Sequence, residues 1–257
     1  MSSYLMLLIA SGLFLASLFI VLLHNFPWIM RCYIPRIHNV KLSLDDLPVF
    51  IVSDIHLGNK NSLGVYVFKI ASKYSFRTMV IAGDLIDKRV FFSDKVFDLL
   101  KMFLVGDVKN VFYIPSSSSH DIEPLPKNVI TQYFNGRRVA VVPQALAISI
   151  SNCVGRIYIT HGDYASRNGV VAHLLDAIFT KVLSRPFTVL VLRKVFNAKN
   201  FEWIIYGHTH LTAYLKNYRA VNTGCWIRRP HESMQKAFAI LKCSNGFVEV
   251  RLVRIKN

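Results

Sequence analysis

The pattern of hydrophobic and polar positions divides the chain into two unequal parts. Tyr4–Leu23 is a run of twenty residues without a charged residue or a proline. At about 1.5 Å of rise per residue, such a helix is roughly 30 Å long, which matches the hydrocarbon core of a bilayer. Phe26, Trp28 and Tyr33 follow, and aromatic side chains of this kind favour the headgroup region. The pattern predicts a membrane-spanning helix within residues 1–30.

Two other interpretations of this segment fit less well. A cleaved signal peptide would carry a basic residue before the apolar run and a small-residue cleavage site after it, and this chain has neither. A buried core helix of this length normally has a polar face. Arg31, Arg36 and Lys41 come just after the run, whereas no basic residue precedes it. The positive-inside tendency therefore predicts a single-pass protein of the cell membrane whose C-terminal domain faces the cytoplasm.

From Pro48 onward, short apolar runs alternate with segments of helical spacing. Helices are expected over Leu63–Tyr74 and Val96–Leu104, and a hairpin over Lys236–Cys243 and Phe247–Ile255 around Ser244-Asn245-Gly246. The remaining apolar runs are rich in β-branched residues and predict strands: Val49–Ser53, Thr78–Ala82, Val111–Ile114, Val139–Val142, Ala145–Ile150, Ile157–Thr160 and Trp203–Tyr206. This order indicates an α/β sandwich.

The composition indicates a folded protein that attracts anionic partners. The chain is 53% hydrophobic and 18% charged, which excludes a disordered protein. Thirty-one Lys and Arg against 15 Asp and Glu give a net charge of +16, which attracts nucleic acid, anionic lipid or phosphorylated small molecules. The four cysteines are widely spaced and form no C-x-x-C pair, so we expect reduced thiols rather than a disulfide framework.

Acidic residues and histidines gather where the predicted strands end. These turns are Asp54-Ile55-His56, Gly83-Asp84-Leu85-Ile86-Asp87, Ser116–Ser119 with His120-Asp121, His161-Gly162-Asp163 and Gly207-His208-Thr209-His210. Because ligands of an open α/β sheet gather beyond the carboxyl ends of its strands, the five turns are expected to converge. Aspartate and histidine are typical ligands of Zn, Mn or Fe. A carboxylate such as Asp84 can bridge two ions, which is the arrangement that two-metal phosphoester hydrolysis needs.

This ordered set of motifs resembles that of the calcineurin-like metallophosphoesterases. The set D-x-H, G-D-x-x-D, H-D, H-G-D and G-H-T-H extends from Asp54 to His210. Within the family, Asp54–Gly58, His161–Asp163 and Asn222–Trp226 are most similar to the branch of UDP-diacylglucosamine pyrophosphohydrolase. The resemblance implies an α/β sandwich of two mixed β-sheets flanked by helices, with a dinuclear metal centre and, here, one N-terminal transmembrane helix before it.

The resemblance also implies a role for each matching residue. Asp54, His56 and His210 would hold the first metal, His161 and His208 the second, and Asp84 both. His120 would contact the phosphate and protonate the leaving group, which suits a side chain that titrates near neutral pH. Supporting roles are expected for Asp87, Asp121 and Asp163, which would orient ligands or backbone groups, and for Asn222 and Arg167, which would bind substrate.

One position departs from the family pattern. Ser118-Ser119 stands where the family has Gly-Asn before His-Asp, and the asparagine oxygen is normally a ligand of the second metal. Ser119 would replace it with a shorter and weaker donor, or the serine run is a plain loop without a metal role. The substitution therefore predicts weaker binding of the second ion.

The expected organisation is a membrane anchor over 1–30, a juxtamembrane linker over 31–47 and a metallophosphoesterase domain over 48–257. Within that domain, residues 164–200 would form a helical, cap-like insertion in which Pro186 separates two helices. The alternatives are a pair of helices that simply face the core, or a second transmembrane hairpin, which the interspersed charges disfavour.

The sequence as a whole favours a membrane-anchored phosphoesterase or pyrophosphohydrolase that acts by attack of a metal-bound hydroxide. Two divalent ions are expected as cofactors, Mn before Fe, Zn or Ni, and the partners would be a phosphate-containing small molecule or a lipid-linked nucleotide. The alternatives are a nuclease of the same fold, for which no aromatic–basic binding module is present, and a degenerate protein that binds phosphate or membrane without catalysis.

Overall fold

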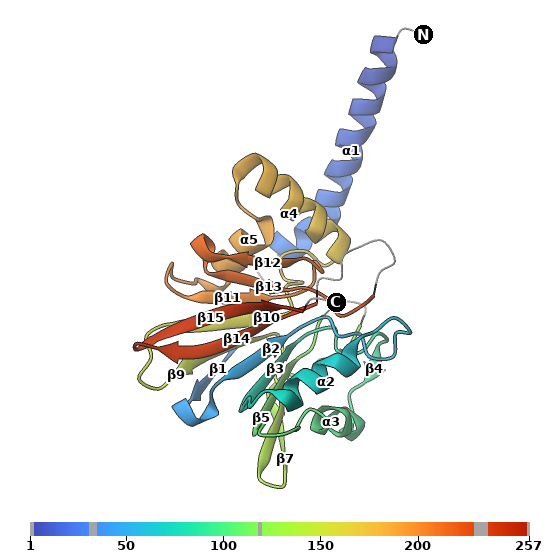
Figure 1. Ribbon diagram of the computed structural model, residues 1–257. Coiled ribbons are helices and arrows are strands. Elements are labelled where there is room, and N and C mark those ends of the chain that lie inside the picture. The colour runs from blue at the N-terminus through green and yellow to red at the C-terminus, as the bar shows by residue number, and fades with distance from the viewer. Residues whose placement is uncertain (1–2, 31–34, 118–119, 229–235, 256–257) are drawn as a thin grey trace.

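The computed structural model describes residues 3–30, 35–117, 120–228 and 236–255. An N-terminal helix, α1 (Ser3–Met30), projects from a body made of two stacked β-sheets with helices on both outer faces (Figure 1). Its segment Tyr4–Val21 is long and apolar enough to cross a membrane, and no part of that segment is buried inside the protein. Its length and composition are those of a membrane span, and its role as an anchor stays a prediction.

One sheet has seven strands. Their order is β15 (Phe247–Arg254), β14 (Ala237–Ser244), β2 (Val49–Val52), β3 (Thr78–Ala82), β5 (Asn110–Ile114), β8 (Arg137–Val141) and β7 (Ile130–Phe134). The central strands β2, β3, β5 and β8 are parallel, while β14 and β7 pair antiparallel with the strands beside them. The carboxyl ends of β2, β3 and β5 therefore lie at one edge of the sheet.

The other sheet has six strands. Their order is β1 (Ile37–Leu42), β9 (Ala145–Ile150), β10 (Arg156–Thr160), β11 (Trp203–Tyr206), β13 (Ala220–Thr223) and β12 (Thr212–Leu215). Here β10, β11 and β13 are parallel neighbours. Smaller elements complete the fold: the pair β4 (Val90–Phe91) and β6 (Ile122–Glu123), and the 3-10 turns Leu44–Asp46 and Lys216–Tyr218.

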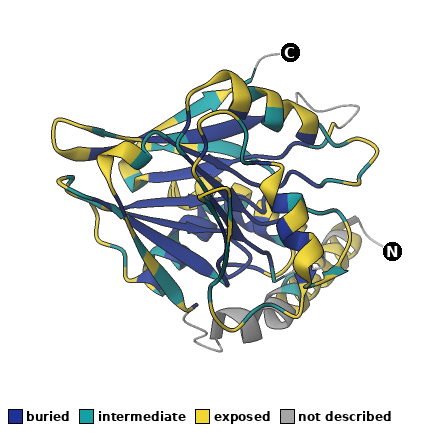
Figure 2. Cartoon of the chain, turned by 90° about the horizontal axis from the view of Figure 1, so that it is seen from below, coloured by how far each residue is buried: buried dark blue, intermediate teal, exposed yellow. Residues whose placement is uncertain are grey.

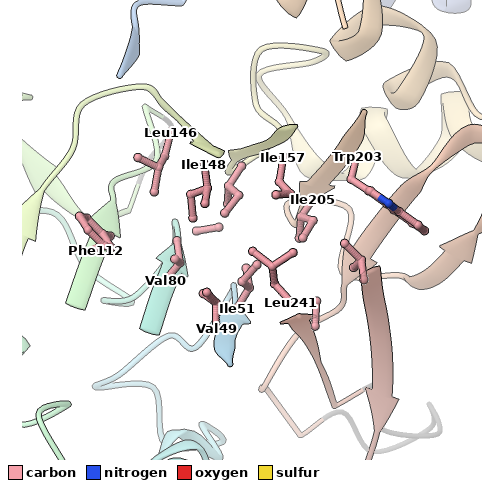
Figure 3. Close-up of a cluster of buried hydrophobic side chains, with 14 of the residues drawn as sticks. Val49, Ile51, Val80, Phe112, Leu146, Ile148, Ile157, Trp203, Ile205 and Leu241 are labelled. Atoms are coloured by element: carbon pink, nitrogen blue, oxygen red, sulfur yellow. The ribbon is translucent and has the colours of Figure 1, made fainter. Parts of the chain in front are cut away.

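Alternation along the strands explains how both faces of each sheet are buried (Figure 2). In β2, Val49 and Ile51 point into the space between the sheets, whereas Phe50 and Val52 point to the outer layer. The inner cluster joins residues of both sheets, such as Val80 with Ile148 and Ile205 (Figure 3). Strands buried on both faces read as continuous apolar runs, which is why the sequence showed them clearly.

Four helices cover the outer faces. Helices α2 (Gly64–Lys73) and α3 (Asp94–Lys101) pack on the seven-stranded sheet, and α5 (Phe187–Phe196) packs on the six-stranded sheet through Val189, Leu192 and Phe196. Helix α4 (Gly169–Leu183) contacts α5 and exposes more of its surface. The fold class predicted from the sequence, an α/β sandwich of two mixed sheets flanked by helices, is confirmed.

The juxtamembrane linker expected over residues 31–47 contains a strand. Ile37–Leu42 forms β1, which pairs in parallel with β9 at the edge of the six-stranded sheet. The sandwich therefore begins at least eleven residues before Pro48. An edge strand buries little of its surface, and the segment I-H-N-V-K-L accordingly lacks the apolar run that marked the central strands.

The expectation of reduced thiols throughout was wrong. Cys153, in the turn between β9 and β10, forms a disulfide with Cys243 of β14, with their Cα atoms 6.1 Å apart. The bond joins the two sheets, and 90 residues separate its partners in the sequence. Only the stacking of the sheets brings the two cysteines together, so their spacing in the sequence carried no signal.

Candidate metal centre

The site is built where the parallel strands of both sheets end. Asp54 and His56 follow β2, Asp84 follows β3, His161 follows β10, and His208 and His210 follow β11. The turns are bonded to one another, since the Asp54 N–H donates to the Gly83 carbonyl and the Gly207 N–H donates to the His161 carbonyl. The convergence predicted from strand ends is therefore present in the fold.

Four of the expected metal-binding residues form one compact group. Asp54, His56, Asp84 and His210 each place a ligand atom within 4.8 Å of the corresponding atoms of the other three. The Asp54 carboxylate lies 3.3 Å from Nε2 of His210 and also accepts the His208 N–H at 3.1 Å. Asp54 is fully buried and His56 nearly so, which protects this group of donors from bulk water.

Asp84 lies between His56 of this group and His161, one of the two remaining histidines. Its Oδ2 is 3.7 Å from His56 Nε2, and its Oδ1 is 3.5 Å from His161 Nε2. Nδ1 of His208 lies 3.1 Å from the same nitrogen of His161. The two oxygens of one carboxylate thus face histidines on opposite sides, which is the position expected of a bridging ligand.

Hydrogen bonds on the outer sides of the rings set the orientation of the histidines. His161 Nδ1 donates to the Ala82 carbonyl at 3.2 Å, and His208 Nε2 donates to the Ser166 carbonyl at 2.7 Å. With those protons placed outward, His161 Nε2 and His208 Nδ1 present their lone pairs to the centre. On the opposite side, Asp87 Oδ1 lies 3.2 Å from His56 Nδ1 and favours the same inward orientation of His56 Nε2.

The close packing of buried carboxylates and imidazoles shifts the pKa values of the site residues. Burial lowers the pKa of His56 and of His208 to about 4, and burial raises the pKa of Asp84 to about 6. Burial also opposes the protonation of His161, but the Asp84 and Asp54 carboxylates outweigh it and raise its pKa to about 9. For His210, hydrogen bonds with Asp54 and Cys225 likewise outweigh burial and raise its pKa to about 11. In the absence of a metal ion the carboxylates therefore favour protons on these two rings, and a bound cation would take the place of those protons.

Behind the ligands, two further acids hold the turns in place. The buried carboxylate of Asp121 accepts the N–H groups of Asp84, Ile86 and Ser116 at 2.6, 3.0 and 2.9 Å. Asp163 accepts both the N–H and the hydroxyl of Ser117 at 2.6 Å. Both acids thus orient backbone groups of the site, the kind of role expected for them.

His120 lies at the rim of the centre. Its Nδ1 donates to the Asp87 carbonyl at 2.6 Å, and its ring meets that of His56 edge-on with centroids 5.0 Å apart. His120 is only half-buried, so Nε2 is the ring nitrogen left to face a bound phosphate. This geometry is compatible with the expected transfer of a proton to a leaving group.

The two residues expected to bind substrate differ in their surroundings. Asn222 is buried, and its amide donates to Thr209 Oγ1 at 2.7 Å and accepts the Gly224 N–H at 3.0 Å. These bonds hold two loops together, and the expected contact of Asn222 with a substrate stays a prediction. Arg167 is exposed, one residue after Ser166, and its expected role stays a prediction. Ser119 lies outside the described residues.

Sequence reasoning missed the contribution of two glycines and one carbonyl. A Cβ at Gly83 would collide with the His161 ring, and a Cβ at Gly207 would collide with Asp54 Oδ2 and Ser53 Oγ. The Ser166 carbonyl fixes the tautomer of His208. The glycines are visible in the motifs G-D and G-H, where their proximity to acid and histidine was the available signal.

Buried polar atoms without hydrogen bonds show that this group of side chains fits a metal ion. His56 and Asp84 are buried, yet neither ring nitrogen of His56 and not Oδ1 of Asp84 makes a hydrogen bond within the part of the chain that is described. Buried polar atoms are normally paired, and their desolvation is costly when they are not. Two imidazole nitrogens and two carboxylates in the compact group form a donor set suited to a divalent transition metal.

The comparison with known families is decisive. A sequence model of the calcineurin-like phosphoesterases matches residues 47–211, most of the chain. The chain belongs to this family. This phosphoesterase is accordingly a metal-dependent phosphoric ester hydrolase, as predicted. The finer resemblance to the UDP-diacylglucosamine branch is not shown and stays a prediction.

Solved structures with some likeness to this phosphoesterase are distant in sequence. A single mutant of Vps29 from Entamoeba histolytica has 13% identity over 82% of this chain and 100% of its own, with a TM-score of 0.44. A predicted phosphoesterase from Streptococcus pneumoniae has 13% identity over 80% and 97%, with a TM-score of 0.39. An archaeal phosphodiesterase has 12% identity over 81% and 100%, with a TM-score of 0.38. No curated protein matches the chain.

Proposed function

We propose that the phosphoesterase holds two divalent metal ions that share Asp84, and hydrolyses a phosphate ester or diphosphate beside a membrane. The observation that carries the proposal is the position of Asp84, whose two oxygens face His56 on one side and His161 on the other. Asp54 and His210 would complete the first position, and His208 the second. The preference for Mn²⁺ that the sequence suggested remains a prediction.

In this proposal the protein's own groups divide the work. Bound divalent ions would supply positive charge for the phosphate and lower the pKa of a water molecule. Asp54, Asp84 and the four histidines fix where those charges lie, with the outward hydrogen bonds of His161 and His208 preventing ring rotation. His120 Nε2 would give a proton to the departing oxygen, while the Asp87 carbonyl holds its Nδ1.

Helix α4 supports a substrate with a lipid part. Its N-terminal turn adjoins the site, because a Cβ on Gly169 would lie 2.7 Å from the His208 carbonyl oxygen. Val170, Leu174 and Val182 of α4 are 78%, 48% and 72% exposed, and Arg167, Lys181 and Arg185 are exposed beside them. Exposed apolar side chains flanked by basic ones suit an acyl chain and an anionic headgroup. A lipid-linked nucleotide is therefore the substrate class we propose. Within residues 164–200, α4 is the element that would act as the cap over the site.

The test compares Asp84→Asn with Asp107→Asn, an exposed acid outside the site. Wild type and Asp107→Asn are expected to bind close to two metal ions per chain and to hydrolyse an aryl phosphodiester. Asp84→Asn should lose at least one ion and slow turnover by at least about a hundredfold, because one shared ligand serves both positions. Equal metal content and turnover in the two variants would refute the dinuclear proposal.

The substrate class is tested separately on the wild-type protein. Turnover of a nucleotide diphospholipid in mixed micelles is expected to exceed cleavage of single-stranded DNA at equal phosphate concentration. The +16 charge is the observation that favours the nuclease alternative. Faster cleavage of DNA would support that alternative and contradict the lipid-linked substrate.

A further inference from the structure

Cys225 comes from one more turn at the edge where the metal centre lies. It follows β13, the parallel neighbour of β11, so its turn lies beside the one that carries His208 and His210. Its side chain is a free thiol and is 6% exposed. Its Sγ lies within 4.8 Å of ring nitrogens of both His56 and His210. The thiol thus faces two of the proposed ligands of the first metal.

The backbone around Cys225 is fastened to the ligand turns. The Trp226 N–H donates to the Asp54 carbonyl at 2.9 Å, and the Leu63 N–H donates to the Trp226 carbonyl at 2.7 Å. The Ile227 N–H donates to Cys225 Sγ at 3.4 Å. The sulfur is therefore held in place by its own loop and stabilised as an acceptor, the environment that supports a metal-bound sulfur.

A buried thiol usually serves as a small apolar side chain among other apolar groups. Cys225 instead faces two imidazoles, and one of them has a ring nitrogen without a hydrogen bond. His56 is 2% exposed; its Nδ1 lies 3.2 Å from Asp87 Oδ1, while its Nε2 makes no hydrogen bond among the described residues. A ring nitrogen that is buried without a hydrogen bond, on a histidine within 4.8 Å of the sulfur, indicates a ligand shared by the two.

We propose that Cys225 is itself a metal ligand, through Sγ, at the position that His56 and His210 share. The inference rests on the proposed metal centre and adds a donor that the family motifs do not contain. Thiolate sulfur is a soft ligand and favours zinc and iron over manganese. The first position should therefore prefer Zn²⁺ or Fe²⁺, which changes the metal expected from the sequence.

The test is X-ray absorption at the zinc edge of the full-length protein loaded with zinc, after the metal content per chain has been measured. The expected spectrum contains one sulfur at about 2.3 Å among nitrogen and oxygen neighbours at about 2.0–2.2 Å. Cys225→Ser should lose the sulfur, whereas Cys32→Ser, which also removes one thiol, should retain it. Cysteines 153 and 243 are joined to each other, so Cys32→Ser leaves Cys225 as the one free thiol.

Each outcome decides the matter. A sulfur neighbour in Cys32→Ser supports the proposal even if Cys225→Ser does not fold. Bound zinc with only nitrogen and oxygen neighbours overturns the role of Cys225 and leaves the metal centre intact. Failure of the wild-type protein to bind zinc, manganese or iron overturns the metal centre and the role of Cys225 together.

Discussion

Backbone conformation at single residues aims the ligands of the centre. Asp54, His56, Asp84, His208 and His210 all have positive φ angles, between 48° and 71°. For residues other than glycine this region costs on the order of 1–3 kcal/mol each, and such residues cluster at functional sites. The left-handed turns reverse the chain just after each strand, so that residues two apart, such as His208 and His210, are directed at one centre.

A substitution at Gly207 tests how closely this packing holds the ligands. Gly207→Ala would push its Cβ against Asp54 Oδ2, and Asp54 cannot retreat because it is fully buried. We expect turnover of an aryl phosphodiester to fall by about a hundredfold, the effect of displacing a catalytic group by roughly 1 Å. Gly12→Ala is the control, because no atom lies within 4 Å of the added methyl group. Unchanged turnover in Gly207→Ala would show that Asp54 tolerates displacement.

For single residues, the sequence predicted which residues lie at the metal centre better than what each of them does there. The residues Asp54, His56, Asp84, His161, His208 and His210 lie together because each follows a strand that was recognisable as an apolar run. The role of Asn222 in binding substrate stays a prediction, and the hydrogen bonds of its buried amide depend on a loop pairing that leaves no trace in spacing. Positive φ angles at aspartate and histidine were equally invisible, since glycine is the residue that normally signals them.

Among the secondary-structure elements, the link between the two sheets is the feature most open to experiment. The disulfide between Cys153 and Cys243 closes a loop of 90 residues, and removing a bond of this kind typically lowers the free energy of unfolding by about 2–4 kcal/mol. Cys153→Ser with Cys243→Ser should therefore lower the unfolding temperature in a non-reducing buffer. Cys32→Ser should leave it unchanged. An unfolding temperature that is insensitive to the double substitution and to reductant would contradict a structural role for the bond.

Most strands that the sequence missed lie at sheet edges, and the exception is β13, a buried interior strand whose run A-V-N-T is too short and too polar to stand out. Central strands such as β3 and β9 were predicted with the bounds they have, because both of their faces are buried. Edge strands β1 and β7 have mixed faces, and their apolar periodicity is too weak to separate them from loops. The same reason explains the mistaken linker over residues 31–47.

For the whole molecule, two features point to opposite compartments. The basic residues after the apolar helix favour a domain in the cytoplasm, whereas a disulfide is typical of an oxidising environment. Protease digestion of oriented vesicles decides between them, and the charge pattern predicts that the domain is digested only when the cytoplasmic face is outside.

Whether α1 anchors the protein at all is a separate prediction. Leu13 and Phe14 lie within its apolar segment and are 64% and 65% exposed. An arginine at the centre of a spanning helix costs about 2.5–3.5 kcal/mol on the insertion scale, so Leu13→Arg with Phe14→Arg should release the protein from the membrane fraction under alkaline extraction. Val65→Arg with Phe91→Arg places the same charges on exposed apolar positions of the body and should leave the protein in that fraction. If Leu13→Arg with Phe14→Arg resists extraction as the wild type does, then α1 is not the segment that anchors the protein in the membrane.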